Sequence, residues 1–236
     1  MTVVIAIDFS PTEKLSMSLK EQLTKYRAGW YTRVPPERQA IMQRHIEQLR
    51  TGTIARTTLK VGDRAPAIVL RNAKGETVDV LNLLKKGPVI VTFYRGGWCP
   101  YCNLELKAYQ EVLPEIVAAG AALVAISPEK PDHALSTVEK NALAFEVLSD
   151  VGQNVGRAFG LVYEFTEELK TAYQGFKQDI PGRNGSPGEW ALPVSATYVI
   201  DRNGMIIYAY TDPDYRDRAD PREVLKVLTE GAVAAA

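Results

Sequence analysis

Residues 89–94, VIVTFY, form an apolar run rich in β-branched side chains, and this run constrains the fold more than any other stretch of the chain. Such a run is typical of a central strand that is buried on both faces of a sheet. A Gly96–Gly97 pair follows it, and the spacing of apolar residues over 100–119 then predicts a helix. The two cysteines of the chain, Cys99 and Cys102, lie at this strand-to-helix junction. Open α/β folds place their sites at the carboxyl ends of central strands, so the junction is the candidate site.

Strands and helices alternate along the chain from residue 60 onward. The pattern predicts strands at 67–71, 77–80, 122–127, 145–148, 197–201 and 205–210, and helices at 132–142, 152–159 and 221–230. Turn signals at 72–75 and 202–204 join two of the strand pairs as hairpins. The alternation predicts an α/β fold with a central mixed β-sheet flanked by helices.

The first part of the chain has helical patterns only. Ser10, Pro11 and Glu13 form a helix-start signal, and Pro35–Pro36 breaks the chain before a second helix, which Gly52 ends. We therefore expect a helical hairpin over residues 10–51. These boundaries predict an N-terminal helical extension over 1–58, a main domain over 59–230 and a tail over 231–236 that frays.

Residues 161–192 are less regular than the rest. The stretch IPGRNGSPGEWALP, residues 180–193, predicts a long loop because it is rich in glycine and proline. Trp190 in this stretch has two interpretations, a lid over the active site or a ring anchored in the core. Four neighbouring aromatic residues form an apolar surface for a bulky substrate or for a partner protomer, or they are part of the core: Tyr163, Phe165, Tyr173 and Phe176.

The composition argues against several function classes. The charge is balanced, with 28 basic and 28 acidic residues, which counts against a nucleic-acid partner and against a basic membrane-binding surface. No apolar run approaches the length that spans a bilayer, and the first nine residues lack the regions of a signal peptide. Two cysteines are too few for a disulfide scaffold. We therefore expect a cytoplasmic protein without membrane or nucleic-acid partners.

The spacing of Cys99 and Cys102 suits a redox couple. Cys99 is expected at the cap or first turn of the helix, where backbone N–H groups and the helix dipole favour a thiolate. Pro100 fits the first turn because its missing N–H costs nothing there. Cys102 lies one turn on, so we assign attack to Cys99 and resolution to Cys102. Arg95 is a candidate cation beside the thiolate, and Gly96–Gly97 would let the backbone turn tightly and bring a substrate close.

Two other interpretations of the cysteine pair remain open. The pair could be no more than core packing. It could also be half of a metal site, but zinc needs about four ligands, and only His45 and His133 could supply ring nitrogens. Neither histidine lies near the pair in the sequence, so we expect no metal ligands.

Five segments between about Val61 and Leu228 follow one another in the order of a known family: VGDRAPAIVL, VIVTFYRGGWCPYC, LVAISPE, LSDVGQNVGRAFGL and LPVSATYVIDRNG. With them the chain resembles the alkyl hydroperoxide reductase / thiol-specific antioxidant branch of the thioredoxin superfamily, that is, the peroxiredoxin-like or redoxin proteins. The resemblance implies a thioredoxin-like fold and thiol-dependent reduction of a hydroperoxide, with Cys99 as the attacking cysteine. It further implies no cofactor and a thioredoxin-type thiol donor, and it is compatible with a homodimer.

The chain departs from the family pattern at two positions. The family has a threonine three residues before the attacking cysteine, where this chain has Gly96. Ser195 stands where the family has a peroxide-activating arginine and where thioredoxin-like reductases have a cis-proline. Arg95 is therefore our candidate for the missing arginine. Trp98 is the choice of thioredoxins at its position, and the Cys-Pro-Tyr-Cys sequence that contains Tyr101 is shared with glutaredoxins.

Three function hypotheses follow. In the first, a thiol peroxidase, Cys99 becomes a sulfenic acid, Cys102 condenses with it to a disulfide, and a thioredoxin-type donor resets the pair. In the second, a protein-disulfide reductase, Cys99 attacks a disulfide and Cys102 releases the product. The third is a redox sensor without catalysis, whose CxxC changes the affinity for a partner.

Overall fold

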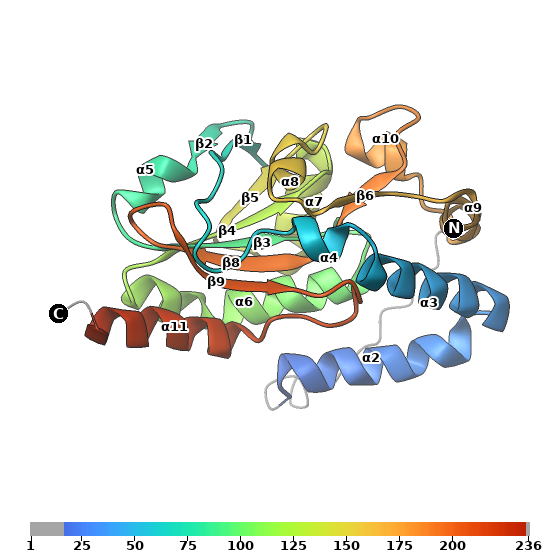
Figure 1. Ribbon diagram of the computed structural model, residues 1–236, viewed down its shortest axis with the longest axis horizontal. Helices are drawn as coiled ribbons and strands as arrows, with labels where there is room; N and C mark the ends of the chain where they lie inside the picture. Colours follow the sequence, from blue (N-terminus) through green and yellow to red (C-terminus); the bar gives the residue numbers. More distant parts are fainter. Residues whose placement is uncertain (1–16, 235–236) are drawn as a thin grey trace.

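A seven-stranded mixed sheet forms the centre of the protein in a computed structural model, which describes residues 17–234 and the side chains as far as Thr229 (Figure 1). In spatial order the strands are β2 (Thr77–Asp79), β1 (Val69–Asn72), β5 (Glu146–Ser149), β4 (Ala122–Ser127), β3 (Val89–Phe93), β8 (Ala196–Ile200) and β9 (Ile206–Thr211). Strand β4 runs parallel to β3 and β5, whereas all other neighbours are antiparallel. The predicted mixed sheet and both hairpins are confirmed.

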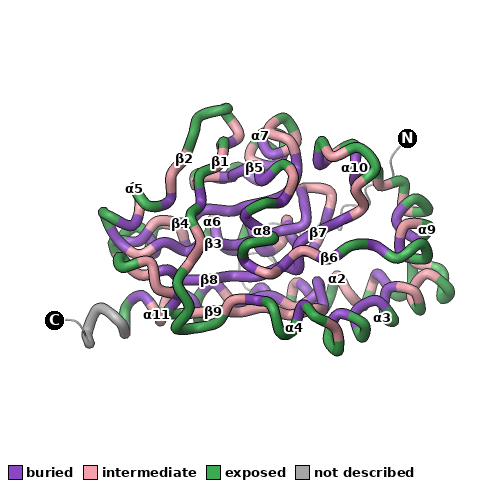
Figure 2. The backbone as a smooth tube through the Cα atoms, turned by 45° about the horizontal axis from the view of Figure 1, so that its top comes forward, coloured by how far each residue is buried: buried purple, intermediate pink, exposed green. Residues whose placement is uncertain are grey.

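Strand β3 lies between β4 and β8 and is buried along its whole length (Figure 2). Its side chains alternate between the two faces of the sheet, as the pleat requires. Val89, Val91 and Phe93 join one hydrophobic cluster, whereas Ile90 joins another on the opposite face. The apolar run at 89–94 therefore forms a strand without a solvent-exposed face. The segment that contains Cys99 and Cys102 follows directly after its carboxyl end.

Helices cover both faces of the sheet (Figure 1). One face packs against α6 (Pro100–Ala118) and α11 (Pro221–Ala234), and the other packs against α5 (Val80–Leu84) and α8 (Asn154–Ala158). Helix α7 (Pro131–Asn141) packs beside β5 and contacts α6. Helix α11 extends past Glu230, where the sequence pattern placed its end, and the fraying of residues 231–236 stays a prediction. No described helix is long and apolar enough to cross a membrane.

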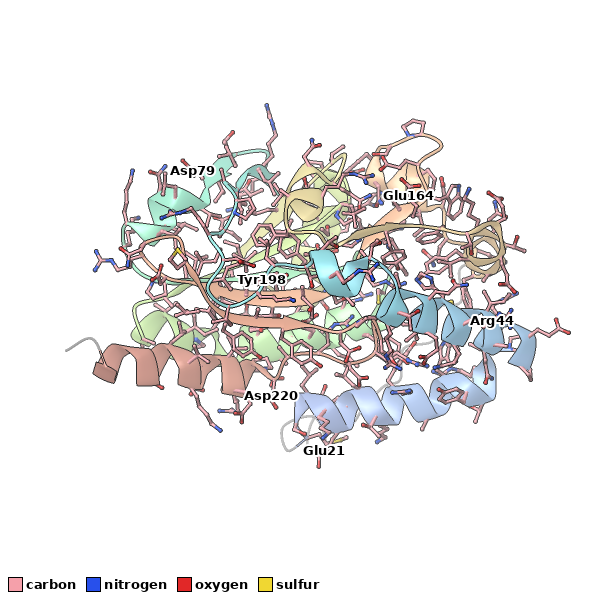
Figure 3. All side chains as sticks on the ribbon, in the orientation of Figure 1. Glu21, Arg44, Asp79, Glu164, Tyr198 and Asp220 are labelled. Atoms are coloured by element: carbon pink, nitrogen blue, oxygen red, sulfur yellow. The ribbon has the colours of Figure 1, made fainter. Side chains whose placement is uncertain are left out.

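The N-terminal extension packs on its own domain. Helix α2 (Leu19–Arg33) lies along α6, and α3 (Pro36–Thr51) lies along α9 (Glu167–Gly175), with the short α4 (Ile54–Thr57) leading into the sheet domain. Ser18 caps α2 and forms a reciprocal capping box with Glu21, whose side chain is labelled in Figure 3. The predicted helix start at Ser10 lies outside the described residues. Helix α3 begins and ends as predicted, with Gly52 at its C-cap.

The predicted long loop over 180–193 is wrong. Helix α10 (Ile180–Asn184) and strand β7 (Ala191–Pro193) occupy most of it, and β7 pairs antiparallel with β6 (Val162–Glu164). The Asp179 side chain caps α10, and Gly185 ends it in a left-handed conformation. Proline and glycine here mark the ends of short elements. The strand pairing depends on a partner about thirty residues away, which local composition does not show.

Gly160 lies where the extension meets the sheet domain. The backbone N–H of Leu59 donates to the Phe159 carbonyl at 3.3 Å, and the Thr57 hydroxyl donates to the Gly160 carbonyl at 3.1 Å. Gly160 has a φ of +70°, and a Cβ atom there would lie 2.0 Å from the Thr57 carbonyl oxygen. Only glycine permits both this conformation and this close approach.

We expect Gly160→Ala to lower the free energy of unfolding by roughly 3 kcal/mol, because backbone strain and a clash with a carbonyl add together. Gly75→Ala is the matched control, since its φ is +85° and a Cβ atom there would meet nothing within 4 Å. The control should lose only about 1 to 2 kcal/mol. Urea unfolding measures both, and equal losses would show that the contact with Thr57 is unimportant.

Candidate active site

Cys99 is the N-cap residue of α6, and Pro100 occupies the first turn, as the sequence predicts. The Sγ atom of Cys99 therefore lies at the positive end of a helix of 19 residues. Cys102 follows one turn later on the same helix. The side chains of Cys99 and Cys102 are 1% and 0% exposed, and both are free thiols.

The turn before Cys99 is held by a buried carboxylate. Gly97 donates its backbone N–H to Glu129 Oε2 at 2.6 Å, and Arg183 of α10 donates from Nε to Glu129 Oε1 at 2.9 Å. Glu129 is fully buried. Arg183, which belongs to the segment predicted as a loop, thus stabilises the turn before Cys99 through Glu129.

The Gly96–Gly97 pair serves close packing within the protein. Gly96 has a φ of +139°, and a Cβ atom there would lie 2.4 Å from Trp98 Nε1. A Cβ atom at Gly97 would lie 2.0 Å from the Thr137 hydroxyl oxygen. The tight packing explains why glycine is needed at both positions, and the expectation that the pair brings a substrate close stays a prediction.

Arg95 provides the cation that the sequence suggests. Its Nη1 lies 3.7 Å from the Sγ of Cys99, and the side chain is 2% exposed. The guanidinium carbon lies 4.1 Å from the centre of the Tyr215 ring and 5.0 Å from that of Trp98. Cation–π contacts with these rings replace part of the lost hydration.

A second buried arginine was missed by sequence reasoning. Arg218 lies between β9 and α11, and it donates from Nη2 to the Sγ of Cys102 at 3.4 Å and from Nε to Glu105 Oε2 at 2.8 Å. Glu105 is 1% exposed. One signal was available, because Glu105 lies three residues after Cys102 and four before Tyr109, on the inner stripe of α6. Nothing in the charged sequence DPDYRDRAD, residues 212–220, marks Arg218 as buried.

The two thiols have opposite acidities. Burial acts to raise the pKa of Cys99, but a hydrogen bond from the Cys102 thiol and the charges of Arg95 and Arg218 overcome it and lower the pKa to about 6. Burial raises the pKa of Cys102, and the hydrogen bond and negative charge of Cys99 raise it further. At pH 7 the pair thus holds its negative charge on Cys99, which is the nucleophilic form.

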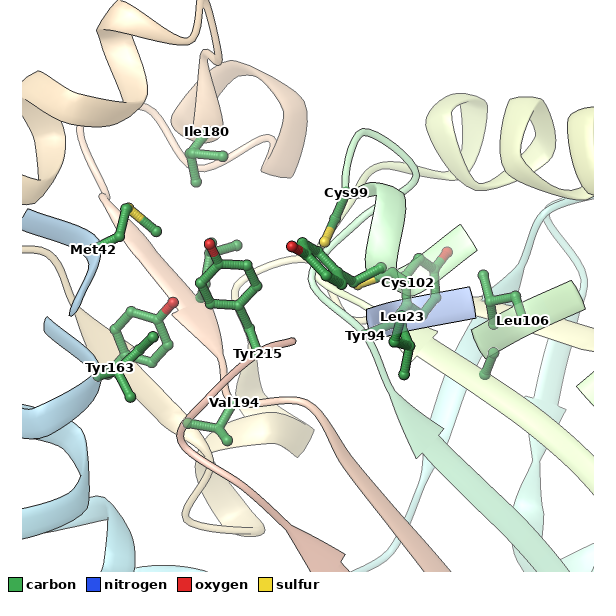
Figure 4. Close-up of a cluster of buried hydrophobic side chains, with 14 of the residues drawn as sticks. Leu23, Met42, Tyr94, Cys99, Cys102, Leu106, Tyr163, Ile180, Val194 and Tyr215 are labelled. Carbon is green, nitrogen blue, oxygen red and sulfur yellow. The ribbon is translucent and has the colours of Figure 1, made fainter. Parts of the chain in front are cut away.

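A cavity of about 490 Å³ opens onto Cys99. Its lining combines aromatic side chains with cations from five parts of the chain: Tyr26, Trp30 and Arg33 of α2, the turn with Arg95 and Trp98, Tyr101 of α6, Tyr173 of α9 with Phe176 and Lys177 after it, and Tyr215. Figure 4 shows Leu23, Met42 and Tyr215 gathered in the same cluster as the two cysteines. The N-terminal helices therefore complete the site.

Four buried hydrogen-bond donors that line this cavity have no partner within the described protein: Arg95 Nε, Trp98 Nε1, Tyr101 Oη and Tyr173 Oη. Buried polar groups are nearly always paired, so these four donors are exceptions. Trp98 Nε1 packs against Gly96.

Ser195 and Trp190 do not line the cavity. Ser195 lies between β7 and β8, is 2% exposed and has an unpartnered hydroxyl. Trp190 is half-buried, and its ring lies 5.8 Å from that of Phe165. Among the aromatic residues of segment 161–192, Tyr173 and Phe176 line the cavity instead.

His45 is buried against Tyr163, with 4.8 Å between the ring centres. Burial, together with the positive charge of Arg95, lowers the pKa of His45 to about 4, so the ring is neutral at pH 7. Within residues 17–234, no group of three or more His, Cys, Asp or Glu side chains is placed to hold a metal ion.

Comparison with known proteins identifies the family and the fold. The model of the AhpC/TSA family matches residues 61–209. Chloroplastic peroxiredoxin Q of Oryza sativa subsp. japonica is 28% identical over 167 residues, which are 71% of this chain and 65% of that protein. The N-terminal helices lie outside the family match.

Solved structures show the same fold. Peroxidoxin BcpB of Mycobacterium tuberculosis matches with a TM-score of 0.60 and 21% identity over 73% of this chain and 97% of that one. The bacterioferritin comigratory protein of Xanthomonas campestris, whose title describes alkyl peroxide reduction activity, matches with a TM-score of 0.54 and 18% identity, covering 70% and 92% of the two chains. The thioredoxin-like fold expected from the resemblance is confirmed.

The rate at which iodoacetamide alkylates Cys99 should rise with pH, with its midpoint at about pH 6, and level off at higher pH, because the thiolate is the reactive form. Arg95→Met should move this midpoint upward by roughly 1 to 2 pH units, since it removes a cation from beside the sulfur. Peptide mass spectrometry assigns the alkylated cysteine. Arg44→Met, which removes an exposed cation from α3, is the control. An unchanged midpoint in Arg95→Met would contradict the role of Arg95.

Proposed function

Because the chain belongs to the AhpC/TSA family and is a thiol peroxidase, we propose that it reduces organic hydroperoxides through the Cys99–Cys102 couple. The observation that carries the proposal is the Arg95 guanidinium 3.7 Å from Cys99 Sγ at the N-cap of α6. This geometry supports a thiolate at neutral pH on a sulfur that borders the cavity. It also supplies donors for the oxygens of a substrate.

The first step is attack of the Cys99 thiolate on the hydroperoxide. A bond forms between Sγ and the terminal oxygen, the O–O bond breaks, and the alkoxide that leaves takes up a proton to become an alcohol. Cys99 becomes a sulfenic acid. Arg95 and the unpartnered hydroxyls of Tyr101 and Tyr173 would donate hydrogen bonds to the oxygens as charge develops on them. Arg95 then takes the part that the family gives to an arginine at the position of Ser195.

The second step closes the disulfide. Cys102 attacks the Cys99 sulfenic acid, water leaves, and a thioredoxin-type dithiol donor reduces the disulfide to restore both thiols. The N-cap and N3 positions of one helix bring the two sulfurs within reach without movement of the backbone between elements.

The cavity supports a substrate larger than hydrogen peroxide. Its volume of about 490 Å³ and its aromatic walls suit an apolar body attached to the peroxide group. The alternative function, reduction of protein disulfides, is favoured by Trp98 and the CxxC spacing. It requires a protruding sulfur, whereas Cys99 is 1% exposed at the base of a cavity.

Mixing the pre-reduced protein with cumene hydroperoxide tests the proposal, with Trp98 fluorescence as the signal. Cys99→Ser should abolish the reaction, because it removes the nucleophile. Cys102→Ser should consume one equivalent of hydroperoxide and stop with one added oxygen atom, seen by mass spectrometry. A reaction of the native protein no faster than that of a free thiol would contradict the proposal.

Phe176→Ala should lower kcat/KM for cumene hydroperoxide roughly tenfold and leave that for hydrogen peroxide nearly unchanged, because only the larger substrate contacts the ring. Leu135→Ala removes an exposed apolar side chain that lies outside the cavity and serves as the control. Equal losses for both peroxides in Phe176→Ala would argue against a substrate-binding role for the cavity.

A further inference from the structure

A chain of buried polar side chains leads away from Cys102 into the sheet. Arg218 joins Cys102 to Glu105, as described above, and the Thr92 hydroxyl donates to the other Glu105 oxygen at 3.4 Å. The Thr197 hydroxyl lies 3.3 Å from that of Thr92. The remaining nitrogen of Arg218, Nη1, donates to the carbonyls of Tyr215 and Asp217. The guanidinium is therefore fixed in place, with all three nitrogens engaged.

One guanidinium thus serves two acidic groups. Glu105, Cys102 and Arg218 are 1%, 0% and 9% exposed, so water screens their charges poorly. A carboxylate at Glu105 and a thiolate at Cys102 would both be stabilised by the positive charge of Arg218, and the two negative charges would repel each other. The site accommodates one of these negative charges far more readily than both.

We propose that Glu105 is a positioning residue for the resolving step, and that its ionisation controls how far Arg218 stabilises the Cys102 thiolate. The inference rests on the proposed function, since that function assigns resolution to Cys102. With Glu105 protonated, the full charge of Arg218 acts on Cys102. With Glu105 ionised, the carboxylate offsets that charge, and Cys102 holds its proton more firmly.

The surrounding charges agree with this competition. Burial raises the pKa of Glu105 to about 7; Arg218 opposes this rise, and the charge of Cys102 adds to it. Cys102 faces further ionisable groups from four elements: Cys99 of α6, Arg95 and Tyr94 after β3, Tyr163 of β6 and Arg218 before α11. Once Cys99 is a sulfenic acid or a mixed disulfide it no longer titrates as a thiol, and Glu105 is then the acidic group among them that changes charge near neutral pH.

Glu105 influences the step in which Cys102 closes the disulfide. Cys102 loses its proton, and its Sγ attacks the Sγ of the Cys99 sulfenic acid. The S–S bond forms as the S–O bond breaks, and the departing hydroxide combines with a proton to give water. The Cys102 sulfur is oxidised and the Cys99 sulfur is reduced. Only the thiolate of Cys102 is nucleophilic, so the rate follows its population.

Resolution can be measured without peroxide by using 5,5′-dithiobis(2-nitrobenzoate). The Cys99 thiolate attacks the reagent and releases one coloured thiolate, and Cys102 then attacks the mixed disulfide on Cys99 and releases a second. In the full-length protein, Glu105→Gln should accelerate the second phase at pH 8 by about fivefold and leave the first within about twofold. The gain should vanish below pH 6, where Glu105 is already neutral. Gln keeps the size of Glu and an oxygen that can accept from Arg218.

Two further variants separate this role from a structural one. Glu111→Gln makes the same charge change at an exposed position of α6 and should leave both phases unchanged. Arg218→Met should slow the second phase, and adding Glu105→Gln in that background should bring no acceleration, because the shared cation is gone. A second phase in Glu105→Gln that matches the native protein at every pH would overturn the inference. Failure to reduce hydroperoxides would instead refute the proposed function and leave this measurement intact.

Discussion

The site depends on the burial of a negative sulfur beside a buried guanidinium. Removing Cys99 from water acts to raise its pKa, and the hydrogen bond from the Cys102 thiol, together with the charges of Arg95 and Arg218, overcomes this effect. The Arg95 guanidinium lies 3.7 Å from the Cys99 sulfur. Arg95 is itself removed from water, so it needs the faces of Tyr215 and Trp98. The aromatic character of the cavity follows from this need.

Elements outside the family match enclose the site. Helices α2 and α3 precede the matched residues, and the segment with Tyr215 and Arg218 follows them. Together they convert the end of a strand into a cavity of about 490 Å³ with unpartnered donors. The thioredoxin-like core carries Cys99 and Cys102, whereas these additions form part of the wall of the cavity that opens onto Cys99.

Each of the two buried arginines contacts a different cysteine. Arg95 lies against Cys99 and favours attack, and Arg218 lies against Cys102 and is shared with Glu105. A pair of thiols one helical turn apart cannot both carry charge at neutral pH in a dry site. Placing a proton-sensitive carboxylate beside only one of them gives each step its own pH dependence.

The sequence by itself determined the local features of the site: the buried strand, the cap position of Cys99, and Arg95 four residues before it. These features depend on backbone periodicity and on neighbours within one helical turn, both of which the sequence displays. The tertiary structure alone decided that Arg218 meets Cys102 across 116 positions and Glu105 across 113. It also decided that Tyr173 and Tyr215 line the cavity, whereas Trp190 and Ser195 do not. Such contacts arise when distant segments pack to bury apolar surface, and no local pattern records which side chains then meet.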